Sequence, residues 1–284
     1  MSLDRRGTGP ARTGRGAAHS EDRERSGGGD FAAEDPAYTI DALGAPVEVS
    51  SPLHGEHQHR NLALAIAAAV ELAGGHRLPI TAAAIAEGIH STRWPGRLER
   101  IFTGQRTGRP TPPEMTEWIL DVAHNPAGAW ALRAALRAFL GLGEPEAPPA
   151  VLVFGCLRDK PLDELAQILF PLFDEVVFAP IQSPRATPVA DLLASAAAVG
   201  TAARGAASVA LALARAEEVL ETPPVSVSST GAQRRPAAFR RGPSRGAAQA
   251  VAGGENGRRV IVVAGSVYLV GEVRPLLLAR AAQP

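Results

Sequence analysis

The chain has 284 residues, of which 45% are apolar and 20% are charged, and its formal net charge is zero. This composition is ordinary for a globular protein of one large or two modest domains, and the zero net charge argues against bulk attraction to nucleic acid or to an anionic membrane. Because no stretch reaches the roughly 18 apolar residues of a membrane span and the single cysteine cannot form an internal disulfide, we expect a cytoplasmic protein, and we expect it to be a monomer.

The first part of the chain combines a polar segment with two predicted helices. Residues 1–30 are mostly Gly, Arg, Ser and acidic residues. They bury too little apolar surface to offset the entropy of ordering, so we expect disorder there. The elements that follow are, in order, a short strand or hairpin over 38–53, a polar stretch His54–Asn61, an alanine-rich helix to about Ala73, and a helix Thr81–His90 with Thr81 as its N-cap.

The turn Trp94-Pro-Gly-Arg97 predicts a domain boundary, because Pro and Gly often interrupt helices and strands. After it, short apolar strands alternate with helices of about ten residues, which predicts a mostly parallel, Rossmann-like α/β sheet covered on both faces. Residues 104–116 are expected to form a loop, and the Ser-, Pro-, Gly- and Arg-rich residues 222–258 a disordered insertion. The predicted strands are Leu98–Phe102, Trp118–Val122, Val151–Gly155, Glu175–Ala179 and Val260–Ala264, and the predicted helices are Ala127–Leu140, Leu162–Phe170, Val189–Ala198, 207–220 and Val270–Arg280.

Lysine usage excludes one nucleotide-binding motif. Lys160 is the only lysine among the 29 basic side chains. A Walker P-loop needs Gly-x-x-x-x-Gly-Lys-Ser/Thr, whose lysine reaches the β- and γ-phosphates. Lys160 instead lies in Leu-Arg-Asp-Lys-Pro-Leu, without that glycine frame. The sequence therefore contains no P-loop of this type.

The stretch from Ile119 to Ala127 places polar groups where a predicted strand ends and a helix begins. Pro126 suits the first helical position, which makes Asn125 the natural N-cap. Asp121 and His124 are then expected at the carboxyl end of a parallel strand, where open α/β sheets bind ligands. The alternative is that Asp121 only hydrogen-bonds the turn and Asn125 only caps the helix.

A second strand end carries Gly265 and Ser266, followed by Tyr268. Gly265 allows the backbone to approach a ligand, Ser266 can donate a hydrogen bond, and a helix N-terminus holds carboxylate or phosphate well. A simple helix cap explains Ser266 equally well. Cys156 lies in an apolar strand, which favours a buried structural thiol over a nucleophile.

Charged groups near two turns leave functional and structural interpretations open. Lys160 follows a third strand end, where it is either a ligand-binding group or a solvated turn charge. Arg97 can grip a phosphate with its fork of donors, or it pairs with Glu99 or another acid. His54, His57 and His59 lie in one short polar stretch without the spaced pairs of a zinc site, so no metal ligand is assigned.

Six motifs follow one another along the chain. They are Gly-x-His-Gln-x-x-Asn (Gly55–Asn61), Trp-Pro-Gly-Arg-Leu-Glu (Trp94–Glu99), Leu-Asp-x-Ala-His-Asn-Pro (Leu120–Pro126), an Asp-Lys turn (Asp159–Lys160), Pro-Arg-Ala (Pro184–Ala186) and Gly-Ser-x-Tyr-Leu-Val-Gly-Glu (Gly265–Glu272). In this order they resemble the folylpolyglutamate/dihydrofolate synthase family of Mur-type ligases, over residues 52–220 and 259–280.

The resemblance implies an ATP-dependent amide ligase. Such an enzyme phosphorylates a substrate carboxylate, and the amino group of L-glutamate then displaces phosphate from the acyl phosphate, with Mg²⁺ and basic groups holding the transferred charge. It implies folate or dihydropteroate and L-glutamate as partners, and ATP and Mg²⁺ as cofactors, most of whose ligands lie outside this sequence. Residues 31–93 would be the C-terminal piece of the central ATP-binding domain, and 94–284 the glutamate-binding domain with its insertion at 222–258.

Residue roles are carried over by position. For ATP, the resemblance implies that Asn61 contacts the base, Arg97 a phosphate and Asp121 the ribose. For glutamate and the reacting centre, it implies His124, which is also the candidate catalytic residue, and Ser266. Lys160 and Tyr268 are weaker candidates for the same site.

Departures from the family pattern leave several hypotheses. The P-loop and the central-domain Glu, His and modified lysine of the family have no counterpart in this sequence. The chain is then a truncated ligase, one part of a split enzyme whose P-loop half is a separate chain, or a non-catalytic nucleotide- or folate-binding module. A Mur-type ligase for another substrate is a further alternative.

Overall fold

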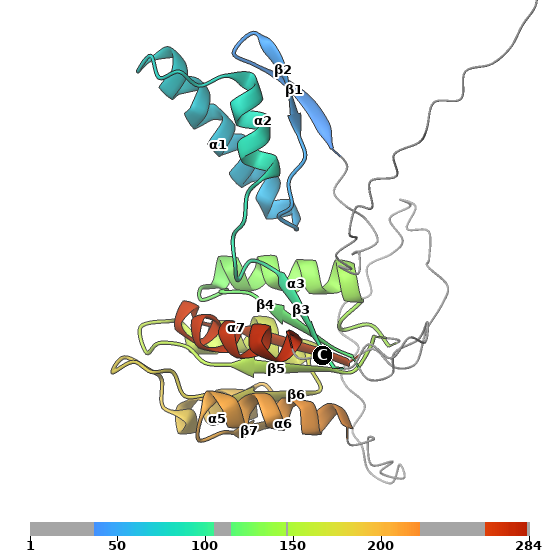
Figure 1. Cartoon of the computed structure of the whole chain (residues 1–284). Helices are drawn as coiled ribbons and strands as arrows, with labels where there is room; N and C mark the ends of the chain where they lie inside the picture. Colours follow the sequence, from blue (N-terminus) through green and yellow to red (C-terminus); the bar gives the residue numbers. More distant parts are fainter. Residues whose placement is uncertain (1–36, 105–114, 146, 222–258, 283–284) are drawn as a thin grey trace, which may run out of the picture. The chain divides into compact units, whose positions relative to one another are not determined.

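The computed structural model describes residues 37–104, 115–145, 147–221 and 259–282 (Figure 1). The disorder predicted for 1–30 and 222–258 concerns residues outside these ranges, as does most of the predicted loop. Within the described ranges, none of the helices is long and apolar enough to cross a membrane.

Residues 38–49 form the predicted hairpin. Strands β1 (Tyr38–Ala42) and β2 (Ala45–Val49) pair antiparallel, with Ala42 opposite Ala45. Leu43 and Gly44 make the two-residue connection, and both have positive φ, at 56° and 75°. Two positive φ values in a two-residue loop give the turn whose twist matches that of paired strands.

Two helices complete this first part of the chain. Helix α1 (Glu56–Gly74) begins at Glu56 rather than after Asn61, so the polar stretch predicted to precede the helix forms its first turns. Helix α2 (Ala82–His90) begins as predicted, with Thr81 Oγ1 accepting a hydrogen bond from Ala84 N–H at 3.1 Å. The residues that α1, α2 and β2 bury together are Val47, Val49, Leu62, Ile66, Ile85 and Ile89.

An apolar groove runs between α1 and α2. Its walls include Ala65 and Ala69 of α1 and Ala84 and Gly88 of α2, and its lining is mostly apolar. Leu64, also on α1, is 65% exposed. This part of the chain therefore carries an apolar surface that its own described residues leave uncovered.

The rest of the described chain is built on a six-stranded sheet in the order β3-β4-β8-β5-β6-β7. Strand β3 pairs antiparallel with β4, and every other neighbouring pair is parallel, which confirms the predicted fold class. The three-residue edge strand β7 was not predicted. The strands are β3 (Glu99–Thr103), β4 (Thr116–Leu120), β5 (Ala150–Phe154), β6 (Glu175–Phe178), β7 (Ala203–Gly205) and β8 (Arg259–Ala264).

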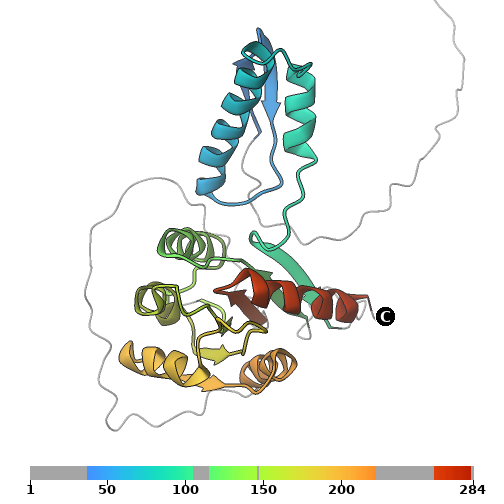
Figure 2. The same cartoon turned by 90° about the vertical axis from the view of Figure 1, so that its left-hand side faces the viewer.

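Helices cover both faces of this sheet, as Figures 1 and 2 show. Helices α3, α4 and α5 contribute to one buried cluster, and α6 and α7 to the other. Helix α7 begins three residues earlier than predicted, so Pro275 lies near the middle of the helix rather than near its first turns. The helices are α3 (Pro126–Leu140), α4 (Leu162–Leu169), α5 (Val189–Ala198), α6 (Val209–Glu221) and α7 (Val267–Ala281), with a short 3₁₀ turn at Phe170–Leu172.

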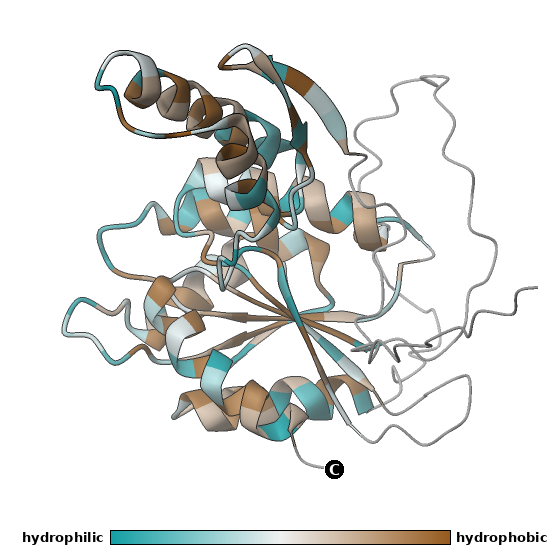
Figure 3. Ribbon diagram, turned by 45° about the horizontal axis from the view of Figure 1, so that its top comes forward, coloured by the Kyte–Doolittle hydropathy of each residue, from teal (hydrophilic) through white to brown (hydrophobic). Residues whose placement is uncertain are grey.

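Strand β5 is apolar throughout because neither of its faces meets water. In β5, Leu152 and Phe154 face the α3–α5 side while Val151 and Val153 face the α6–α7 side, and all four are fully buried. Figure 3 shows the same division, with apolar strands in the middle of this part and polar groups on the outer faces of its helices. Because β4, β8, β5 and β6 are mutually parallel neighbours, their carboxyl ends all open onto one edge of the sheet.

Candidate functional site

The carboxyl edge of the sheet carries most of the sequence-predicted site residues. Asp121 and His124 follow β4, Ser266 follows β8, and Lys160 follows β5. Strand β8 lies between β4 and β5, and there the strand order reverses direction. Ligands of open α/β sheets bind at such a reversal, outside the carboxyl ends of the strands.

Asp121 joins the end of β4 to the turn before β3. Its Oδ1 accepts a hydrogen bond from Ala123 N–H at 2.9 Å, and its Oδ2 accepts one from Leu98 N–H at 3.1 Å. Burial raises the pKa of Asp121, although these two hydrogen bonds and the charges of Arg97 and His124 act in the opposite direction. Each carboxylate oxygen can accept more than one hydrogen bond, so Asp121 keeps capacity for a ligand.

The raised pKa of Asp121 predicts a pH dependence of stability. The folded protein binds this proton more tightly than the unfolded chain does. The stability that Asp121 contributes is therefore fully present below the ordinary carboxyl pKa of about 3.9 and is lost as the pH rises through the raised folded value. The Asp121→Asn variant lacks this titration. We expect the free energy of unfolding of the wild type, minus that of the variant, to fall in urea titrations as the pH rises above the ordinary carboxyl pKa of about 3.9; a flat or rising difference contradicts the assignment.

The turn that carries Arg97 is fixed from two sides. Glu99 Oε2 accepts a hydrogen bond from Gly96 N–H at 2.9 Å, and Arg274 Nε of α7 pairs with both Glu99 carboxylate oxygens at 2.9 Å. The alternative that Arg97 pairs with Glu99 is therefore wrong, since the partner of Glu99 is Arg274. Arg97 lies close enough to Asp121 to affect its pKa, so the structure brings these two candidate nucleotide ligands together.

His124 is held in a defined orientation. Its Nδ1 lies 3.0 Å from the Val122 carbonyl oxygen. A carbonyl can only accept, so Nδ1 carries the hydrogen in this contact and the Nε2 lone pair of the neutral ring stays available. Asn125 Oδ1 accepts a hydrogen bond from Gly128 N–H at 2.8 Å, which confirms Asn125 as the N-cap of α3. The ring of His124 is thus oriented by the Val122 carbonyl beside the start of a helix.

Gly265 and Ser266 shape the start of α7. Gly265 has φ 104°, and a Cβ there would lie 2.7 Å from the Gly155 carbonyl oxygen, so only glycine fits without strain. Ser266 is buried, and its Oγ accepts a hydrogen bond from Tyr268 N–H at 3.2 Å. The helix-cap interpretation of Ser266 is therefore confirmed, and its O–H remains a donor for a ligand at this helix end.

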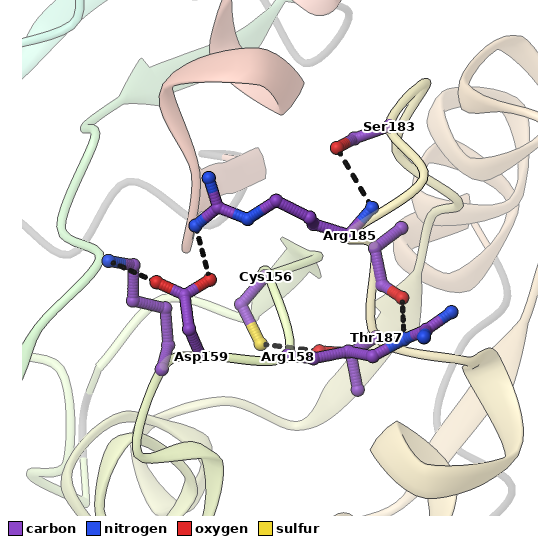
Figure 4. Close-up of polar contacts among 8 residues, drawn as sticks. Cys156, Arg158, Asp159, Ser183, Arg185 and Thr187 are labelled. Carbon is purple, nitrogen blue, oxygen red and sulfur yellow. Dashed lines mark hydrogen bonds and ion pairs between the residues drawn. The ribbon is translucent and has the colours of Figure 1, made fainter.

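Lys160 belongs to a charged cluster with Asp159 and Arg185. Of these three residues, only Lys160 was proposed as a site residue from the sequence. Lys160 Nζ lies 3.1 Å from Asp159 Oδ2, and Arg185 Nη2 lies 2.7 Å from Asp159 Oδ1 (Figure 4). Arg185 follows β6 in the Pro-Arg-Ala motif, but no role was predicted for it. Arg185 could have been found from the sequence, because the Asp-Lys turn and the Pro-Arg-Ala motif follow neighbouring parallel strands whose carboxyl ends lie at one edge of the sheet.

Two other residues singled out in the sequence, Asn61 and Cys156, lie in different surroundings. Asn61 lies on α1, where its Nδ2 donates to Gln58 Oε1 at 2.9 Å. Cys156 is fully buried, and burial raises the pKa of its thiol, as expected for a structural cysteine. Among the described residues, no group of three His, Cys, Asp or Glu side chains is arranged to hold a metal ion.

The sheet topology defines a Rossmann-like α/β domain, and its switch point is the candidate ligand site. Residues 96–226 match the family model described as "Mur ligase, glutamate ligase domain". The chain is 35% identical over 143 residues to a dihydrofolate synthase/folylpolyglutamate synthase of Mycobacterium tuberculosis, a match covering 50% of the chain and 26% of that protein. It is 32% identical over 144 residues to a folylpolyglutamate synthase of Lacticaseibacillus casei, covering 50% and 30%.

A solved structure gives the same assignment. A folylpolyglutamate synthase of Mycobacterium tuberculosis, complexed with ADP and AMPPCP, superposes with a TM-score of 0.60 and 26% identity. That match covers 87% of the chain and 46% of the solved one. The chain therefore spans less than half of the relatives it matches. The family resemblance read from the six motifs is confirmed, as a likeness to the C-terminal portion of these synthases.

Proposed function

We propose that this chain is the glutamate-side portion of an ATP-dependent ligase that joins L-glutamate to folate, to dihydropteroate or to both. The observation that carries this is the carboxyl edge of the sheet, where the motif residues of a glutamate ligase domain meet. In this proposal residues 31–93 complete a central ATP-binding domain, and 94–284 form the glutamate-binding domain. ATP supplies the phosphoryl group that activates the substrate carboxylate, and Mg²⁺ balances its charge.

The residues of this chain have separate tasks in that reaction. Arg97, fixed by the Glu99–Arg274 pair, neutralises a nucleotide phosphate, and Asp121 accepts hydrogen bonds from the ribose hydroxyls. The donors at the start of α7, with Ser266, receive the α-carboxylate of glutamate. Asn61 contacts the base.

His124 is proposed to act on the attacking nitrogen. An amine attacks an activated carboxyl only after it has lost a proton, and the Nε2 lone pair of His124 can receive that proton because Nδ1 is bound to the Val122 carbonyl. The neutral amino group of glutamate then attacks the acyl phosphate, phosphate leaves, and the amide bond forms. The tasks divide along the edge, with proton transfer after β4 and carboxylate binding after β8.

Because Lys160 is the only lysine, we propose that the P-loop comes from a separate half outside these 284 residues. The experiment mixes the purified chain with the N-terminal half of the Mycobacterium tuberculosis relative and measures glutamate-dependent ADP release with tetrahydrofolate or dihydropteroate. We expect release from the mixture and none from either part alone. Turnover by the chain alone refutes the external P-loop. A mixture without turnover, with no binding of ATP, folate or glutamate, refutes the ligase function.

A further inference from the structure

The turn that carries Arg97 lies against helix α7. This helix runs beside β3, the strand that follows the turn (Figures 1 and 2). Gly96 has φ 71°, and a Cβ there would lie 2.9 Å from Val270 Cγ1. One helical turn further along, Arg274 pairs with Glu99, the first residue of β3. Val270 and Arg274 are four residues apart, so one face of α7 supports the turn at two points.

The carboxylate of Glu99 is held by two donors. Its Oε2 accepts a hydrogen bond from Gly96 N–H at 2.9 Å, and Arg274 Nε lies 2.9 Å from both of its oxygens. The Glu99 side chain is 19% exposed and that of Arg274 is 35% exposed. An ion pair that is partly shielded from water in this way is stronger than one on an open surface. Arg274 therefore occupies the acid that lies nearest to Arg97 along the chain.

A second acid near Arg97 is also held by other donors. Asp121, whose pKa the charge of Arg97 affects, accepts hydrogen bonds from the N–H groups of Leu98 and Ala123. Neither of these N–H groups carries a charge, and neither uses a donor of the Arg97 guanidinium. The structure thus provides both acids with partners other than Arg97.

Loss of Arg274 would change this balance. The Glu99 carboxylate would then lack its cation, two residues from the guanidinium of Arg97. Arg100, which adjoins Glu99, is held by Glu117 of the neighbouring strand at 2.5 Å. Arg97 is therefore the cation with which Glu99 would pair. A guanidinium paired with a carboxylate has fewer donors and less net charge to offer a phosphate.

We propose that Arg274 is a positioning residue for nucleotide binding: by holding Glu99, it prevents this acid from pairing with Arg97 and leaves the Arg97 guanidinium to a phosphate. This inference rests on the proposed function, in which Arg97 neutralises a nucleotide phosphate. It adds to that function a residue of α7 that acts through Glu99 rather than by touching the nucleotide.

The first test is a titration of the full chain with ADP, followed by amide chemical shifts in NMR spectra. We expect the Arg97→Gln and Arg274→Gln variants each to bind ADP about tenfold more weakly than the wild type, because each loses the charge-assisted phosphate contact. In Arg274→Gln, hydrogen exchange of the Gly96 amide should also become about tenfold faster, since Glu99 leaves it. Unchanged ADP affinity or unchanged Gly96 exchange in Arg274→Gln overturns the inference.

The decisive variant combines Glu99→Gln with Arg274→Gln. The glutamine at position 99 keeps an oxygen for Gly96 N–H, but it has no charge with which to pair with Arg97. We expect this double variant to recover ADP affinity to within about threefold of the wild type. If Arg274 only stabilised the fold, the double variant would bind ADP as weakly as Arg274→Gln, because the ion pair is absent from both. That result overturns the inference.

Arg280→Gln is the matched control. Arg280 lies on the same helix, is 36% exposed and pairs with a glutamate, Glu217 of α6, at 3.3 Å. It has no contact with Glu99 among the described ion pairs, so its replacement should leave both ADP affinity and Gly96 exchange at the wild-type values. Equal losses of ADP affinity in Arg280→Gln and Arg274→Gln contradict a specific role for Arg274.

The outcomes separate this inference from the proposed function. If Arg97→Gln weakens ADP binding and Arg274→Gln does not, the inference is wrong and the proposed phosphate contact stands. If the wild-type chain does not bind ADP, or binds it equally well after Arg97→Gln, the phosphate contact is itself wrong and the inference falls with it.

Discussion

Replacing Gly265 by alanine is expected to destabilise the protein by about 2–6 kcal/mol. Gly265 has φ 104°, where an L side chain is strained by about 1–3 kcal/mol. A Cβ there would also lie 2.6 Å from the Phe154 ring and 2.7 Å from the Gly155 carbonyl, so the packed end of β5 must move, which adds about 1–3 kcal/mol. The measurement is the free energy of unfolding from urea titration followed by tryptophan fluorescence.

Gly271→Ala supplies the control on the same helix. A Cβ at Gly271 meets no atom within 4 Å, and the residue lies inside α7. Alanine should therefore stabilise the protein by about 0.5–1 kcal/mol, the ordinary helix-interior difference. If Gly265→Ala is no more destabilising than Gly271→Ala, the backbone at the end of β8 does not approach Phe154 and Gly155 of β5 as closely as described here.

Replacing His124 by alanine is expected to lower the turnover of the reconstituted ligase by about 10²–10⁴-fold, the usual contribution of a positioned proton acceptor. The change should be in the rate of amide formation, measured at saturating glutamate. The affinity for ATP should not change, because the nucleotide contacts are assigned to Arg97 and Asp121. The His124→Gln variant, which keeps a polar side chain but cannot accept the proton from an ammonium, should be equally slow.

His90→Ala is the control for that experiment. His90 is an exposed residue at the end of α2, outside the sheet edge. Its replacement should leave turnover within about twofold of the wild type, as for surface substitutions away from a site. A His124→Ala ligase with normal turnover and a raised KM for glutamate would make His124 a binding residue rather than a proton acceptor.

Local signals explain which elements could be predicted from the sequence. The apolar runs of β5 and β8 and the caps Thr81 and Asn125 identify their elements directly, because burial and capping act over a few residues. Helix α1 gave no comparable signal, since it begins after Gly55 without a side-chain cap. Strand β7 is three residues long and only partly buried, so its pattern is too short to recognise.

The site divides in the same way. Asp121, His124 and Ser266 could be proposed because each directly follows a strand with a readable pattern. The pairing of Asp159 with Arg185 joins residues from two separate loops, and only the order of strands in the sheet brings them together. The Glu99–Arg274 pair is a longer-range case, linking the first strand of the sheet to its last helix. Spacing along the chain carries no information about such pairs.

The position of β8 also determines how the sheet can be assembled. Strand β8 comes last along the chain among the described strands, yet it pairs with β4 on one side and β5 on the other. Before residues 259–264 leave the ribosome, β4 and β5 have no neighbour to join them, and the two halves of the sheet cannot close. Long-range pairing of this kind makes folding slow and exposes unpaired strand edges to other chains. We therefore expect the pairing of β8 with β4 and β5 to be the slow step when the denatured chain refolds.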